Sequence, residues 1–190
     1  MALDSFHVES GCNKLGLLKK LNRLTGSLSL NIYLNRSSDL KELVEDAREV
    51  ELKNKIHVQA LFIIFEDLID EKERSSSTLS FWMDVIKALE PYQELKELTI
   101  VGYMGSTLPY WISSPLNFVK DIKLIGSSEV HSLPAMGRLP FLELLMLENM
   151  CQLKVVGMEF LGIESSSSSS TSDVVVAFPK LRKLILPPSQ

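Results

Sequence analysis

Residues 139–150 read LPFLELLMLENM, and within them Leu142, Leu145 and Leu147 follow the spacing LxxLxL. The end of this spacing alternates apolar residues with others, which is the pattern of a short β-strand whose apolar side chains point to one face. Leucine is a common residue, so a single match carries little information. Recurrence of the spacing at a regular period therefore decides the fold.

The spacing does recur along the chain. Three further segments match it fully, at Leu95, Leu98, Ile100, at Val119, Ile122, Leu124, and at Leu181, Leu184, Leu186. Two earlier segments match more loosely, at Val58, Leu61, Ile63 and at Thr25, Leu28, Leu30. The middle steps are 24 and 23 residues long, which is the length of one coil of a leucine-rich repeat.

These repeats predict an α/β repeat fold. One coil cannot bury its own apolar face, so a core forms only where neighbouring coils stack. We expect a leucine-rich-repeat solenoid with a short-strand parallel sheet on the concave face and an irregular or helical convex side. The chain is predicted to be one such domain over 1–190. Loop insertions are expected at about 66–80, which is acidic and serine-rich, and at 164–173, which contains six consecutive serines.

Two convex helices are predicted. Residues 38–52 begin with a serine or aspartate that can cap a helix. Residues at helical spacing follow the cap and form a stripe along one side of the helix: Leu40, Leu43, Ala47, Val50 and Asn54. Residues 78–89 carry a second stripe. Both stripes are interpreted as facing the core in preference to a partner helix. The other returns contain Pro109, Pro134 and Pro140, which favour irregular or 3₁₀ turns. Trp82 and Trp111 are expected to fill the convex core.

Composition excludes several functions. Twenty basic and 24 acidic residues give a net charge of -4, so no electropositive surface is expected for nucleic acid or membrane. The longest apolar run, 60–65, is too short to span a membrane. The charged N-terminus does not resemble a signal peptide. We therefore predict a soluble intracellular protein in the cytoplasm or nucleus, with Cys12 and Cys151 as free, buried thiols.

No motif for catalysis or for a metal is present. His7, His57 and His131 lie in unrelated segments, and no HExxH, GxSxG or phosphate-loop motif occurs. We therefore predict that the chain is not an enzyme. We expect it to have no catalytic, cofactor-binding or metal-binding residues and to bind no cofactor.

Several motifs carry a family resemblance. LKELTIVGYMGSTLPYWI, HSLPAMGRLPFLELLMLENM and FLGIE before the serine run occur in order, and upstream segments such as VEDAREVELKNKIHVQALFIIF fit the same series. Together they resemble the leucine-rich-repeat region of plant coiled-coil-class nucleotide-binding leucine-rich-repeat (NB-LRR) disease resistance proteins. The chain departs from the commoner repeat pattern in one respect. Tyr103, Ser127 and Met150 stand where an asparagine or cysteine usually follows the strand.

The resemblance implies a non-catalytic recognition and autoinhibitory region of an immune receptor, present here as a fragment without the nucleotide-binding domain. The implied partner is a protein: a pathogen effector, a guarded host protein, or the receptor's own nucleotide-binding domain. A stand-alone adaptor for a ubiquitin ligase is the alternative.

The residues between the inward-facing leucines are the candidate contacts, because they point to the opposite face of the sheet. They form three columns: Glu97, Asp121, Leu144, Lys183; then Thr99, Lys123, Met146, Ile185; then Val101, Ile125, Glu148. Apolar residues at exposed positions favour an interface. Cover by a loop or by an absent domain explains them equally well.

Overall fold

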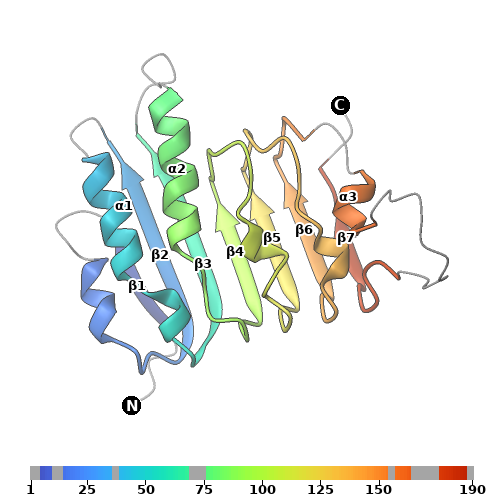
Figure 1. The fold of residues 1–190 in the computed structure, drawn as a ribbon, viewed down its shortest axis with the longest axis horizontal. Helices are drawn as coiled ribbons and strands as arrows, with labels where there is room; N and C mark the ends of the chain where they lie inside the picture. Colours follow the sequence, from blue (N-terminus) through green and yellow to red (C-terminus); the bar gives the residue numbers. More distant parts are fainter. Residues whose placement is uncertain are drawn as a thin grey trace, which may run out of the picture.

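The computed structural model describes residues 5–9, 15–35, 39–68, 76–153, 157–163 and 176–187. Its strands form one sheet in which each strand is parallel to the next along the chain (Figure 1). In order they are β1 (Ser5–Glu9), β2 (Gly26–Leu34), β3 (Val58–Asp67), β4 (Glu97–Val101), β5 (Asp121–Ile125), β6 (Leu144–Glu148) and β7 (Lys183–Ile185). This order confirms an α/β repeat fold, because stacked coils pair neighbouring strands in sequence.

The register of the sheet follows the leucine spacing. Leu98 pairs with Ile122, and Ile122 pairs in turn with Leu145. Leu145 then pairs with Leu184, so the middle residue of each motif occupies the same rung on four adjacent strands. The aligned side chains of Leu98, Ile122 and Leu145 are fully buried, as an apolar column inside a stack of coils requires.

Helices α1 (Leu40–Glu49), α2 (Ser76–Ala88) and α3 (Met158–Leu161) lie on one face of the sheet (Figure 1). The remaining returns contain the 3₁₀ turns η1 (Gly16–Lys20), η2 (Leu52–Asn54), η4 (Tyr110–Ile112) and η5 (Met136–Arg138). Short 3₁₀ turns at η4 and η5 confirm the prediction for these proline-containing returns. Among the described residues, no helix lies on the opposite face, and none is long and apolar enough to cross a membrane.

Helix α1 begins as predicted. The side chain of Asp39 accepts hydrogen bonds of 2.9 Å and 3.2 Å from the backbone N–H groups of Lys41 and Glu42, so Asp39 is the N-cap. Leu43, Ala47 and Val50 are buried, which confirms the core-facing stripe. Asn54, expected at the end of the stripe, is exposed because the chain has left the helix at Glu49 and turned into η2.

The predicted loop at 66–80 is wrong at both ends. Strand β3 continues to Asp67, because β2 pairs with it as far as Leu34 and Asp67. Helix α2 begins at Ser76, and Thr78 in its first turn is already buried. Residues 69–75 lie outside the described residues, as does the predicted insertion at 164–173.

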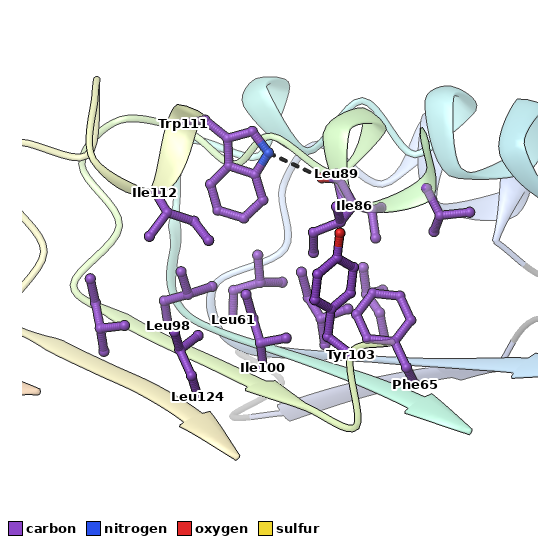
Figure 2. Close-up of a cluster of buried hydrophobic side chains, with 14 of the residues drawn as sticks. Leu61, Phe65, Ile86, Leu89, Leu98, Ile100, Tyr103, Trp111, Ile112 and Leu124 are labelled. Atoms are coloured by element: carbon purple, nitrogen blue, oxygen red, sulfur yellow. Dashed lines mark hydrogen bonds between the residues drawn. The ribbon is translucent and has the colours of Figure 1, made fainter. Parts of the chain in front are cut away.

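The core fills the space between the sheet and the helical layer (Figure 2). Four strand side chains point toward the helical layer: those of Leu61, Leu98, Ile100 and Leu124. Opposite them lie the side chains of Trp111, Ile112, Ile86 and Leu89. The indole Nε1 of Trp111 donates a 3.0 Å hydrogen bond to the carbonyl oxygen of Ile86. This bond ties the η4 turn to helix α2. Trp82 and Trp111 are both fully buried, which confirms their expected place in the convex core.

Four features of the fold differ from the sequence-based expectation. Strand β1 has no leucine motif and was not predicted, and β2 and β3 extend over nine and ten residues and so are not short. Leu184 and Leu186 in the last coil are 45% and 46% exposed, because among the described residues no further strand covers them. Cys151 is an exposed free cysteine, since it follows β6 in a surface turn; Cys12 lies outside the described residues.

Candidate protein-binding face

The face of the sheet opposite the helices, called here the open face, carries the three predicted columns. Glu97 pairs with Asp121, Asp121 with Leu144 and Leu144 with Lys183, so the first column is one continuous rung. The second rung joins Thr99, Lys123, Met146 and Ile185, and the third joins Val101, Ile125 and Glu148. The structure thus brings all eleven residues onto adjacent positions. Their role as a binding site stays a prediction.

The apolar residues of these rungs are partly accessible. Val101 and Ile125 lie side by side on β4 and β5, and Leu144 and Met146 lie on β6. All four are half-buried, whereas the leucines that alternate with them are fully buried. An apolar surface that stays partly exposed on a sheet is a feature of interaction sites.

The open face extends beyond the predicted residues onto β3. Phe62 pairs with Thr99, and Ile64 pairs with Val101, so the third rung continues as Ile64, Val101 and Ile125. Phe62 and Ile64 are half-buried. Sequence reasoning missed both residues because residues 60–65 read ALFIIF. Apolar side chains on both faces of a strand hide the alternation that identifies an exposed position.

A row of polar side chains continues the open face onto β2. Ser29, Asn31 and Tyr33 alternate with the buried leucines and isoleucine of that strand. Ser29 Oγ donates to Asn31 Oδ1 at 3.5 Å, and Asn31 Nδ2 donates to the Tyr33 hydroxyl at 3.5 Å. The open face is therefore polar on β2, apolar on β3, mixed on β4 and β5, and apolar again at two positions of β6.

The turns that follow β4 and β5 hold the upper edge of the open face in register. The N–H of Gly102 donates to the carbonyl oxygen of Ile125 at 2.8 Å, and the N–H of Gly126 donates to that of Glu148 at 2.9 Å. The three residues that replace the usual asparagine or cysteine, Tyr103, Ser127 and Met150, are all buried. Each of these hydrogen bonds joins the glycine that follows one strand to the last residue of the next strand, so the strand pairing continues beyond the strand ends.

The candidate metal ligands of the sequence do not gather in the described part of the structure. Within the described residues, no group of three or more histidine, cysteine, aspartate or glutamate side chains is placed to hold a metal ion. His57 and His131 are exposed and far apart along the chain. The side chain of His7, on β1, is not among those described.

Comparison with known proteins identifies the repeats. Residues 15–150 match the family described as R13L1/DRL21 leucine-rich repeats. A putative disease resistance protein of Solanum bulbocastanum, RGA1, is 35% identical over 132 residues, which cover 69% of this chain and 12% of that protein. RGA4 of the same species is 31% identical over 90% of this chain and 16% of its own length. The putative disease resistance RPP13-like protein 1 of Arabidopsis thaliana is 28% identical over 78% of this chain.

The chain spans only 12% to 16% of the length of the two Solanum relatives. No solved structure matches it significantly. The family match covers most of the chain, and the relatives carry the names that the resemblance to NB-LRR resistance proteins implied. The chain therefore belongs to the R13L1/DRL21 family of leucine-rich repeats, the kind of repeat region that plant disease resistance proteins carry.

Proposed function

We propose that this chain is the recognition and autoinhibitory repeat region of a plant intracellular immune receptor, acting in the cytoplasm as a non-catalytic protein-interaction module. Its coils would form a solenoid whose concave side is the open face. The partner would be a pathogen effector, a guarded host protein, or the receptor's own nucleotide-binding domain. The names of the relatives favour this role over that of a ubiquitin-ligase adaptor.

One observation carries the proposal. Four apolar side chains are half-buried on a face that no described helix covers: those of Val101, Ile125, Leu144 and Met146. The leucines that alternate with them along the strands point to the other face and are fully buried. Burial of apolar surface yields about 25 cal/mol for each Å² removed from water. A protein that covers this face therefore gains binding energy that the isolated chain does not realise.

A quantitative pull-down from infected leaf tissue tests the proposal. The double substitution Leu144→Glu and Met146→Glu places two charges on the open face and is expected to abolish recovery of the partner. The matched control is Leu17→Glu with Met158→Glu, which changes the same residue types at positions that are 68% and 60% exposed and lie away from the sheet. The control should recover the partner like the unmodified chain.

Circular dichroism must show that both double variants remain folded. Recovery that is unchanged by the open-face substitutions would exclude the open face as the partner site. Equal loss in both variants would show that the captured protein recognises exposed apolar surface in general.

A further inference from the structure

Four side chains form a continuous stack beside the beginning of strands β4 to β7. The rings of Phe118 and Phe141 lie nearly parallel, with 5.8 Å between their centroids and 13° between their planes. The Nζ atom of Lys96 lies 4.8 Å from the centroid of Phe118, and that of Lys180 lies 4.0 Å from the centroid of Phe141. Each member of the stack comes from a different coil, so the stack crosses four successive repeats.

The stack leaves the ring edges for a ligand. Each ring has a lysine ammonium over its face and is stacked on the other ring, so its π system already has partners. Phe118 is nevertheless 41% exposed. The edge of an aromatic ring carries partial positive charge, whereas its face is negative. What the stack presents to solvent is therefore positive.

Two more cations flank the stack. Lys120 Nζ lies 3.9 Å and Arg182 Nη1 lies 3.3 Å from a carboxylate oxygen of Glu143. One carboxylate thus serves two cations, and the Arg182 side chain remains 81% exposed. A guanidinium has five N–H donors in a fork that fits a carboxylate, so most of its binding capacity is unused.

The basic rim is defined as Lys96, Phe118, Lys120, Phe141, Lys180 and Arg182. It holds four cations, two of which form ion pairs with the carboxylate of Glu143, in a chain whose net charge is -4. On the coil of β4, the exposed Glu94 stands at the position that corresponds to Phe118 on the next coil. The rim therefore begins at Lys96 and is a local feature of the last four coils.

We propose that the basic rim binds an acidic segment of a partner protein. Carboxylates of that segment would pair with Arg182 and Lys120 and lie against the edges of the two phenylalanine rings. A nucleic acid fits less well, because bases bind by stacking on a free aromatic face, whereas each of these rings already contacts a lysine and the other ring. Lys120 and Arg182 directly precede Asp121 and Lys183 of the first open-face rung. No rim residue belongs to a rung, so this proposal goes beyond the proposed function and is tested by separate substitutions.

Fluorescence anisotropy with a fluorescein-labelled poly-glutamate peptide and the full chain tests the proposal at low ionic strength. The substitutions Lys180→Glu and Arg182→Glu together should weaken binding about tenfold or more, because two attractive pairs become repulsive. Added salt should weaken binding to the unmodified chain, since exposed charges are screened.

The matched control is Lys20→Glu with Arg23→Glu, which makes the same change of charge at exposed positions beside η1. The control should bind within about twofold of the unmodified chain. The open-face double variant should also bind normally, which separates this result from failure of the proposed function. Absence of poly-glutamate binding, or equal losses in the rim and control variants, would overturn the proposal. Tighter binding of labelled oligothymidylate through the same two residues would overturn it in favour of nucleic acid.

Discussion

The hydroxyl group of Tyr103 donates a 2.8 Å hydrogen bond to the carbonyl oxygen of Thr107. Tyr103 lies two residues beyond β4, where leucine-rich repeats commonly place an asparagine or cysteine that binds the backbone of the turn. Its ring is fully buried, with its centroid 5.5 Å from that of Phe65 (Figure 2). The long side chain of Tyr103, which is anchored in the core, thus makes the hydrogen bond to the turn that a short asparagine or cysteine side chain usually makes.

Replacing Tyr103 with phenylalanine should lower the free energy of unfolding by about 1 kcal/mol, because the hydrogen bond is lost while the buried ring remains. Urea denaturation at neutral pH measures the difference. An unchanged midpoint would mean that water replaces the hydroxyl group at no cost.

Tyr103 should also make stability depend on alkaline pH. Burial, reinforced by the charge of Asp84, raises the pKa of Tyr103 well above its ordinary value of 10.0. In the unfolded chain the phenol ionises near pH 10 while the folded form stays neutral. The contribution is therefore complete below pH 10 and is lost as the pH rises above it. Urea denaturation on both sides of pH 10 should show the advantage of the unmodified chain over Tyr103→Phe shrinking at the higher pH.

Gly102 and Gly126 should respond differently to alanine. Their φ angles are 69° and 67°, in the left-handed region, so either substitution should cost about 1–2 kcal/mol in conformational strain. A Cβ at Gly102 would also press on the backbone oxygen of Phe65, whereas at Gly126 the nearest atom is the nitrogen of Gly102 at 3.7 Å. Gly102→Ala should therefore cost about 1–3 kcal/mol more than Gly126→Ala. Thermal unfolding of both variants checks this order, which equal costs would contradict.

Leu145 and Leu184 hold the same motif position on adjacent strands, yet they should differ in energetic weight. Leu145 is fully buried and Leu184 is 45% exposed. Leu145→Ala should lower the free energy of unfolding by about 2–5 kcal/mol through lost contacts and a cavity. Leu184→Ala should cost much less. Chemical denaturation compares the two, and a similar cost would show that the last coil is covered in solution.

Lys55 is a buried cation that should stabilise the first coils. Its Nζ donates to the carbonyl oxygen of Leu18 at 2.7 Å and to Asn22 Oδ1 at 3.0 Å. Lys55→Met keeps the aliphatic length but leaves that carbonyl oxygen without its donor, at a cost of about 1–3 kcal/mol. Lys53→Met, at an exposed position nearby, should change the free energy of unfolding by less than about 0.5 kcal/mol. Denaturation midpoints of the two variants decide, and equal midpoints would contradict the assignment.

Much of the sheet could be predicted because its information is local. The spacing at Leu98, Ile122 and Leu145 predicts strands, their parallel order and the three open-face rungs, since alternation along a strand fixes which side chains share a face. Phe62 and Ile64 could not be placed in the same way. Their strand is apolar on both faces, so its alternation carries no signal, and only pairing with Thr99 and Val101 assigns them to the open face.

The repeat, the register of its strands and the resemblance to a family could be read from the sequence, because they depend on motifs that recur along the chain in a fixed order and at a regular step. Which side chains are buried, and which residues of different coils lie together, depends on the tertiary structure. Leu145 and Leu184 read identically in the motif, yet a following strand covers only the first. Phe118 meets Phe141 because their coils stack. Exposure and side-chain contact depend on neighbours that are distant along the chain, which the pattern of one coil does not contain.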